Sequence, residues 1–442
     1  MLSLTAVCAR AATYTWDGDN NGNWGVGNNW TSNSAPASGG GHDLVFAGSV
    51  NTTTSANGGG WTINSLSFNS GAGAFTSGGG TLTIGAGGIT NNSTATQTIN
   101  NQITLSANQS WNAASGAIVS TGYFDANSKN LTLTGSSAIT ISGQINSAAT
   151  LTLSGSGNRT FGSSVAATTV NVQNTGTNSF SGQLSATTIN VSAGTSTFAN
   201  AQAGSGGINI SGAANATFTG PVAGGSGSGI TLSGSGAIGF SGSITGGTLN
   251  LTSAFTGTAT LSGSGGKNIS STVVSGGTLV MNQSGGDDAI NGSLTVNNGG
   301  TVIFGQDNQV PSWQTVTLNA GSTLLLGNTE QTFQNLVITG NSIIDFGGVD
   351  SQLNLTSNLT ISNGVTLTIR NWDSAAGDVF AGSNPGTSVT IQYADSNGNI
   401  YATGTWGGGY VTPGTPVPEP ATYGLILLGS GVAFVLCRRR RT

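Results

Sequence analysis

The residues that could support catalysis in this sequence are aspartates that occur in pairs. The pairs are Asp287 with Asp288, Asp345 with Asp350, and Asp373 with Asp378. Two carboxyls about 5 to 10 Å apart in a groove would support glycoside hydrolysis, and Arg370 near Asp373 is the one acid–base pairing that a lyase could use. We interpret these acids as solvated loop residues or as members of a cap salt bridge. A polysaccharide lyase or glycoside hydrolase on a β-helix scaffold remains the alternative.

The sequence contains few residues that could form a histidine-dependent catalytic site or a metal site. His42 is the single histidine and is expected in a loop, Gly39-Gly40-Gly41-His42-Asp43, where a solvated ring is favoured over a Ser-His-Asp arrangement. A zinc site has no ligands, because His clusters, Cys pairs and a His-Glu-x-x-His motif are all missing. The stretch Asp17–Gly22 is similar to a calcium loop but lacks the closing bidentate glutamate, which favours a polar turn. The sequence therefore predicts no catalytic residue, no cofactor and no metal.

An internal repeat predicts the elements that make up the body of the chain. Thr168-Thr169-Val170-Asn171-Val172 is followed 19 residues later by Thr187-Thr188-Ile189-Asn190-Val191, and related triplets continue at spacings of 19 to 22 residues. A second apolar position keeps the same spacing: Phe161, Phe180, Phe198, Phe218 and Phe240. Alternation with period two places the valines on one face of a strand and the asparagine on the other. Each unit is thus a pair of short strands separated by Gly/Ser turns.

Units of about 20 residues that cannot bury an apolar face alone are typical of stacked coils. The sequence predicts an all-β protein, a right-handed parallel β-helix, over residues 61–370; an array of β-sandwiches is the alternative. We expect the phenylalanines to form an internal aromatic stack and repeated asparagines to form amide ladders at turns. Aromatic-rich ends predict an N-terminal cap at 13–60, with Trp16, Trp24 and Trp30, and a C-terminal cap at 371–406. A Gly/Pro linker is expected at 407–416.

Composition narrows the classes of partner. Only 5% of the 442 residues are charged, and 74 are glycine. Between Ala12 and Pro418 there are 13 acidic and 4 basic residues, a net charge of about −9. A nucleic-acid partner is not expected, because no basic patch is available to neutralise phosphates. Both cysteines, Cys8 and Cys437, lie in the terminal segments, so no disulfide is expected in the body.

The N-terminus predicts export. Residues 1–12 resemble the end of a secretory signal peptide, with Ala9-Arg10-Ala11 fitting the small-x-small cleavage pattern. A positive n-region is missing and the apolar stretch is short. We interpret the segment as a signal-peptide remnant, and an ordinary disordered start is the alternative.

The C-terminal segment, residues 417–442, has three parts in sequence. Pro418-Glu419-Pro420 precedes an uncharged run from Tyr423 to Cys437, which is followed by Arg438, Arg439, Arg440 and Arg441. The run is shorter than the roughly 20 residues of a typical transmembrane helix, although flanking residues and snorkelling arginines can extend it. The arginines predict a cytoplasmic end and act as the membrane stop, which leaves the body on the other side. The segment is either a permanent anchor or a sorting signal.

This three-part tail resembles the PEP-CTERM sorting signal of bacterial surface proteins. The resemblance implies that an exosortase, a membrane enzyme, recognises Pro418, Glu419 and Pro420 and removes the tail. Glu419 would then belong to a recognition motif and not to a catalytic site. The protein would be exported, held transiently in the membrane by its C-terminal helix, and delivered to the cell surface or extracellular matrix.

The body resembles autotransporter-associated β-strand repeat proteins. The shared features are the opening Trp16-Asp17-Gly18, the closing Arg370-Asn371-Trp372 and the strand starts Gly79-Gly80-Thr81-Leu82, Gly246-Gly247-Thr248-Leu249 and Gly276-Gly277-Thr278-Leu279. The resemblance implies a structural or adhesive role at the surface, associated with biofilm or exopolysaccharide, and carries over no catalytic residue. We therefore expect a protein that is not an enzyme.

Overall fold

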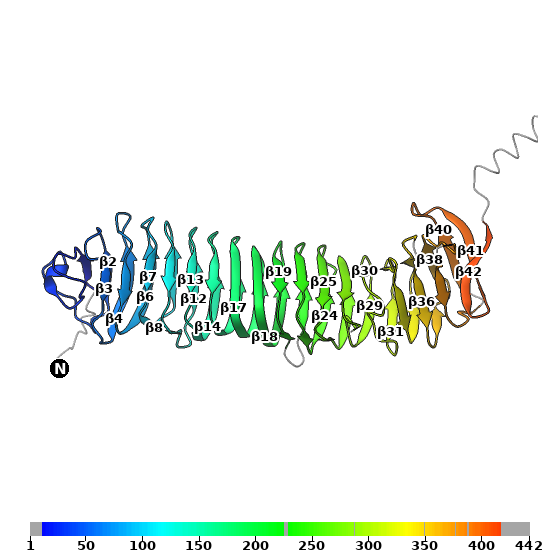
Figure 1. Ribbon diagram of the computed structural model, residues 1–442, viewed down its shortest axis with the longest axis horizontal. Coiled ribbons are helices and arrows are strands. Elements are labelled where there is room, and N and C mark those ends of the chain that lie inside the picture. Colours follow the sequence, from blue (N-terminus) through cyan, green and yellow to red (C-terminus); the bar gives the residue numbers. More distant parts are fainter. Residues whose placement is uncertain are drawn as a thin grey trace, which may run out of the picture. The chain divides into compact units, whose positions relative to one another are not determined.

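The computed structural model describes residues 11–224, 229–286, 288–348, 350–375, 377–386 and 389–416. The chain divides into two compact units. Unit one comprises Met1–Asn250 and Ala254–Ala259, and unit two comprises Leu251–Ser253 and Thr260–Thr442. Each is a parallel β-solenoid, as the repeat predicts, with successive coils stacked through backbone hydrogen bonds (Figure 1). Successive coils pair in parallel, whereas β-sandwiches are built from antiparallel sheets. The alternative fold, an array of β-sandwiches, is therefore wrong.

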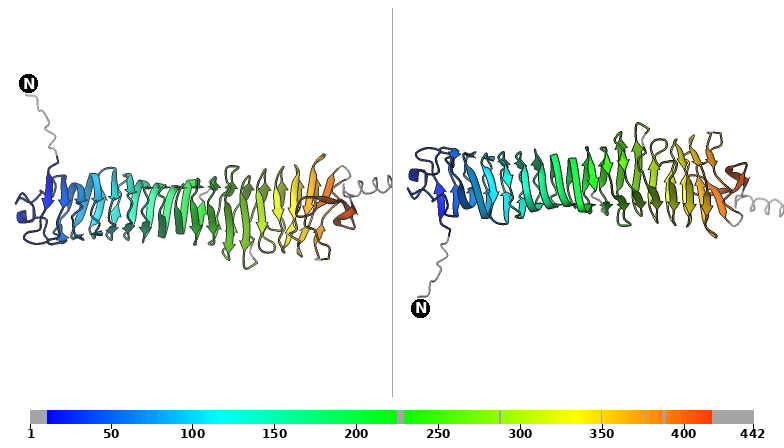
Figure 2. Two further views of the ribbon diagram at one scale, coloured as in Figure 1. Left: turned by 90° about the horizontal axis from the view of Figure 1, so that it is seen from above. Right: turned by 90° about the horizontal axis from the view of Figure 1, so that it is seen from below.

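The described part of unit one consists of strands and a single-turn 3-10 helix, η1 (Gly27–Asn29). Its strands are β1 (Thr13–Trp16), β2 (His42–Phe46), β3 (Thr53–Ser55), β4 (Trp61–Phe68), β5 (Thr76–Gly78), β6 (Thr81–Asn91), β7 (Gln97–Ile99), β8 (Gln102–Leu105), β9 (Gln109–Ala113), β10 (Ile118–Ser120), β11 (Phe124–Asp125), β12 (Leu131–Thr134), β13 (Ile139–Ile141), β14 (Ile145–Leu153), β15 (Arg159–Phe161), β16 (Val165–Val172), β17 (Thr177–Val191), β18 (Thr195–Ile210), β19 (Asn215–Phe218), β20 (Val222–Gly224), β21 (Ile230–Leu232), β22 (Ala237–Phe240) and β23 (Ile244–Thr245). Figure 2 shows these strands side by side, coil after coil.

Two strands, β24 (Thr248–Leu251) and β25 (Thr258–Gly263), contain the boundary between the units. Unit two continues with β26 (Lys267–Asn268), β27 (Ser271–Val274), β28 (Thr278–Gln283), β29 (Ser293–Val296), β30 (Thr301–Phe304), β31 (Thr315–Leu318), β32 (Thr323–Leu325), β33 (Glu330–Phe333), β34 (Asn335–Ile338), β35 (Ser342–Asp345), β36 (Gln352–Leu355), β37 (Leu359–Ile361), β38 (Thr366–Arg370), β39 (Val379–Ala381), β40 (Thr390–Ala394), β41 (Ile400–Gly407) and β42 (Tyr410–Pro416).

The predicted aromatic stack is confirmed in unit one. Phe161, Phe180, Phe198, Phe218 and Phe240 occupy the same register position in successive strands. Consecutive ring centroids lie 4.6, 5.0, 4.9 and 4.9 Å apart, and each pair of planes is inclined by 15° or less. All five rings are buried. The in-register backbone brings equivalent side chains to the coil spacing of about 4.8 Å, which is close enough for the rings to stack.

Amide ladders form on strands, and an amide pair also forms at turns as predicted, where Asn319, after β31, donates to Asn297, after β29, at 2.6 Å. Asn190 on β17 donates from Nδ2 to Oδ1 of Asn171 on β16 at 2.9 Å, and Asn209 on β18 donates to Asn190 at 3.1 Å. These asparagines lie on the outward face, opposite the buried valines and isoleucines beside them. A column of identical amides satisfies donor and acceptor with its own neighbours, so the outer face needs no charge.

A buried cation inside unit one was not predicted. Arg159 on β15 is fully buried, and its guanidinium donates to the carbonyl oxygens of Ser137, Asn158, Gly135 and Ser154 at 2.8 to 3.1 Å. Burial lowers its pKa to about 10. Its column neighbours are Ile139 and Asn178. The side chain therefore satisfies the carbonyls of two tight turns, a structural role.

The ends of the units differ from their middles. In unit one, Trp16, Trp24 and Trp30 are buried with Phe46, and β1 already pairs in parallel with β2, which pairs with β4. In unit two, β41 and β42 form an antiparallel hairpin that pairs with β40 on one side and β39 on the other. The prediction of a linker over 407–416 is therefore wrong: residues 410–416 form the last strand. The glycines that suggested a flexible linker, Gly408 and Gly409, have φ of 61° and 91° and form a tight hairpin turn.

Several predicted segments lie outside the described residues. They are most of the signal-peptide remnant at 1–12, including Cys8, and the whole C-terminal segment at 417–442 with its transmembrane helix. Within the part of the chain that is described, no helix is long and apolar enough to span a bilayer.

We expect Phe198→Ala to lower the free energy of unfolding of unit one by about 3 to 5 kcal/mol, because it removes a ring that stacks on both sides and leaves a cavity. Chemical denaturation followed by circular dichroism measures the change. Thr197→Ala, the outward neighbour on the same strand, is the control and should cost less than about 1 kcal/mol. Equal effects of the two substitutions would contradict a core held by the stack.

Candidate functional site

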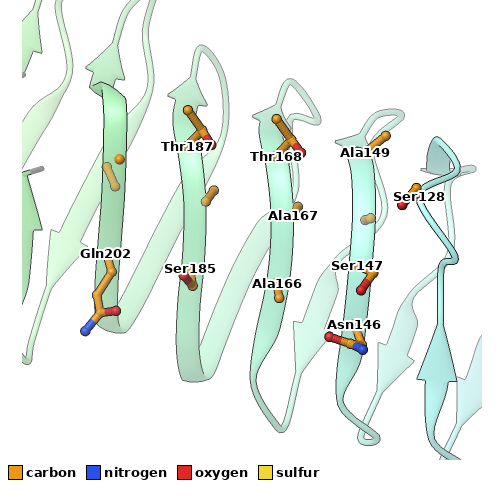
Figure 3. Close-up of a pocket in the computed structure, with 14 residues that line it drawn as sticks. Ser128, Asn146, Ser147, Ala149, Ala166, Ala167, Thr168, Ser185, Thr187 and Gln202 are labelled. Atoms are coloured by element: carbon orange, nitrogen blue, oxygen red, sulfur yellow. The ribbon is translucent and has the colours of Figure 1, made fainter.

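A groove crosses five successive coils of unit one. Its lining comes from the turn after β11 and from β14, β16, β17 and β18: Ser128, Asn146, Ser147, Ala148, Ala149, Ala166, Ala167, Thr168, Ser185, Ala186, Thr187, Gln202, Ala203 and Gly204. Figure 3 shows these side chains on neighbouring strands, with Thr168 and Thr187 toward one end of the strands and Gln202, Ser185 and Asn146 toward the other. The volume of this open groove is about 600 Å³.

Small side chains in register create the hollow. Ala148, Ala167, Ala186 and Ala203 are equivalent residues of four successive strands. The strands are irregular here, since the register shifts between Ile145 and Ala148 in β14, and Ser147 has φ of 55°. Because each of these four side chains is only a methyl group, the surface at this column is lower than the surface beside it, and we call this column the alanine floor of the groove. The groove therefore runs across the strands, along the direction in which the coils stack.

Hydroxyl and amide groups border the alanine floor. Ser185, Thr187 and Gln202 are exposed, and Asn146 donates from Nδ2 to the hydroxyl of Tyr123 at 3.1 Å. Tyr123 is 43% exposed, so an aromatic ring lies beside one end of the groove. No lining residue carries a charge at neutral pH. The groove can bind an uncharged, hydroxyl-rich polymer through many weak hydrogen bonds, but offers no group for acid–base catalysis.

The paired aspartates of unit two bond mainly to backbone N–H groups. Asp378 accepts from the amide of Ser351 at 2.9 Å and from the amide of Asp373 at 2.6 Å, one bond to each carboxylate oxygen. Asp373 accepts from the amide of Ala375 at 2.8 Å. Burial raises the pKa of Asp378; the two hydrogen bonds oppose this, and the charges of Asp373 and Asp350 add to it. This geometry suits turn closure.

The remaining predicted acids are engaged locally or lie outside the described part. Asp345 accepts from the Asn371 side chain at 2.8 Å and from the Gly347 amide at 2.9 Å. It is the register partner of Arg370. Asp287 lies outside the described residues, so the Asp287–Asp288 pair has no geometry to assess.

His42 lies on a strand, which corrects the expected loop. It is the first residue of β2, its ring packs 5.0 Å from that of Tyr14, and its Nδ1 has no hydrogen-bond partner. The neighbouring carboxylate of Asp43 instead accepts from Asn64 and Ser65 at 2.7 and 2.6 Å. The structure thus does not assemble a Ser-His-Asp arrangement around His42.

The loop at Asp17–Gly22 is a polar turn wound around a buried asparagine. Oδ1 of Asn29 accepts from the amides of Asn20 and Asn21 at 3.0 and 2.8 Å, and its Nδ2 donates to Asn21 Oδ1 and to the Asn23 carbonyl. Among the described residues, no group of three or more His, Cys, Asp or Glu side chains could hold a metal ion.

Sequence reasoning did not find the groove. The signal was present only in part, because Ala167 and Ala186 each precede a buried strand residue, Val170 or Ile189, by three positions, whereas Ala203 precedes Ile208 by five. Small residues are common in every turn of this chain, so the pattern becomes informative only when the register is known. The sorting motif Pro418, Glu419 and Pro420 and the arginines Arg438 to Arg441 lie outside the described residues.

Comparison with known families gives one match. The PEP-CTERM protein-sorting motif matches residues 416–441. No curated protein and no solved structure matches the chain. The motif implies an exported, cell-surface-associated protein that an exosortase sorts.

The raised pKa of Asp378 predicts a pH-dependent contribution to the stability of unit two. The folded state retains this proton at a pH where the unfolded chain has lost it, so the contribution falls as pH rises from about 3.9, the ordinary value for aspartate, through the raised value. We expect the difference in unfolding free energy, wild type minus Asp378→Asn, to decrease between about pH 4 and pH 7. Urea titrations at several pH values measure it. A difference that increases with pH would show that hydrogen bonding outweighs burial.

Proposed function

We propose that this chain is a non-enzymatic structural or adhesive component of the cell surface or extracellular matrix that associates with exopolysaccharide. The groove carries the proposal. It is uncharged, it is lined by hydroxyls and amides over an alanine floor, and it extends over five coils. A polymer of repeating sugars can lie along such a surface and form the same weak contacts at each coil.

The outward columns support the same role. Threonine, serine and asparagine repeat on the outer faces of β16, β17 and β18, as in the ladder Asn171–Asn190–Asn209. Equal groups at intervals of about 4.8 Å form a regular polar lattice. The resemblance of the body to autotransporter-associated β-strand repeats, and the sorting motif at 416–441, fit a surface or biofilm protein.

The groove gives a direct test of glycan association. We expect Ala166→Tyr to fill the groove and to reduce retention of the protein on exopolysaccharide purified from the producing culture, about tenfold in dissociation constant. Ala223→Tyr is the matched control, because Ala223 continues the same outward column one coil beyond Gln202 and lies outside the groove. It should bind like the wild type.

Two outcomes of that assay would contradict the proposal. Equal binding by both variants would remove the groove as the contact surface. Shortening of the polysaccharide by the wild-type protein, lost on changing Asp345 or Asp373, would establish the lyase or hydrolase alternative.

Sorting has its own test at the C-terminus. We expect terminal peptides from the extracellular and cell-surface fractions to end between Pro418 and Ala421 and to lack the arginine cluster, as determined by mass spectrometry. The membrane fraction should contain the uncut precursor. Arg438 to Thr442 intact in the membrane fraction alone would indicate a permanent anchor and would remove the main support for a matrix role.

A further inference from the structure

We propose that the hairpin cap, β41 with β42, is a docking surface for the exosortase, which contacts Ile400 and Tyr401 when it binds Pro418-Glu419-Pro420. This inference rests on the sorting step above and adds a partner surface to it. The motif match begins at residue 416, which is also the last residue of β42. The signal therefore follows the folded domain without a linker.

Chain length makes contact with the cap unavoidable. Two peptide steps separate Pro416 from Pro418, and an extended chain spans at most about 3.6 Å per residue, or roughly 7 Å in all. A membrane enzyme that encloses the motif is much larger than this gap. Its surface must lie against the end of the hairpin from which the tail leaves.

The hairpin is held rigidly at that end. Ala402 pairs with Pro416 on one side and with Tyr393 of β40 on the other, and β42 pairs with β39 through Tyr410 and Ala381. Ala402 and Val411 are buried beneath it. The edge presented to an approaching enzyme is therefore preformed.

The side chains at the tail exit are apolar and exposed. Ile400 is 44% exposed and lies two residues before the Ala402–Pro416 pair, and Tyr401 is 37% exposed and lies one residue before it. Residues 400–416 contain no charged side chain. Burial of apolar and aromatic anchors contributes most of the affinity at protein interfaces, so these two side chains are suited to be the contact.

Lipid is the competing occupant, and the distances favour the enzyme. The apolar run begins at Tyr423, seven residues after Pro416, which allows up to about 25 Å between the cap and the bilayer. Contact with lipid is therefore optional. Contact with the enzyme that binds residues 418–420 is required by the two-residue spacing.

The test uses the full chain co-expressed with its exosortase, with tail removal followed by terminal peptide mass spectrometry over time. We expect Ile400→Ser with Tyr401→Ser to slow cleavage about fivefold while membrane insertion is unchanged. Tyr410→Ser is the control: Tyr410 is 49% exposed but six residues along β42 from Pro416, about 20 Å away. It should be cleaved at the wild-type rate.

A second variant keeps the test valid if the double substitution disturbs the cap. Ten Gly/Ser residues inserted after Pro416 leave the cap intact but release the enforced contact. We expect slower cleavage, and no further slowing when the two serines are added. Faster cleavage of the insert would show that the cap obstructs the enzyme and would overturn the inference, as would wild-type cleavage of the double variant.

Two further outcomes separate this inference from the proposed sorting. Loss of the double variant from the membrane fraction would identify lipid as the occupant and overturn enzyme docking. An uncut wild-type chain in the presence of the exosortase would refute sorting itself, and the docking surface with it.

Discussion

In-register stacking of parallel coils is the constraint on which the rest of this structure depends. Each strand hydrogen-bonds to the equivalent strand of the next coil, so every position in a repeat becomes a column with a step of about 4.8 Å. At that distance a side chain's nearest neighbours are its own equivalents. Phe198 therefore contacts Phe180 and Phe218, and Asn190 contacts Asn171 and Asn209. A residue type persists at a position only if it can pack against itself.

The same constraint accounts for the composition. Identical charges in adjacent coils would repel by about 1 kcal/mol per pair in water and by more near a low-dielectric surface. Aromatic rings, β-branched residues, hydroxyls and amides have no such penalty. This explains a chain in which 5% of residues are charged. Arg159 fits the pattern because its column neighbours, Ile139 and Asn178, are uncharged and its two terminal guanidinium nitrogens donate to backbone carbonyls.

The features that could be predicted from the sequence are those that repeat. The fold class and the phenylalanine stack follow from the spacing of Phe161, Phe180 and Phe198, because a column needs no information beyond its period. Features that occur only once in the chain cannot be predicted from the spacing of repeated residues. Arg159 occurs in one coil. The hairpin of β41 and β42 uses antiparallel pairing, which the repeat does not predict. The groove depends on which alanines share a column. The run Gly407 to Gly409 predicts a linker from sequence, because glycine is equally typical of tight turns and of flexible segments.

Closing a solenoid and presenting a sorting signal are competing requirements at one end of unit two. An uncovered strand edge would pair with other chains, and β41 with β42 removes that edge by pairing with β40 and β39. The last strand of this closure ends at Pro416, so residues 410–416 belong to the folded cap and do not form a linker between the cap and the sorting signal. The position of the motif is therefore a consequence of how the sheet ends.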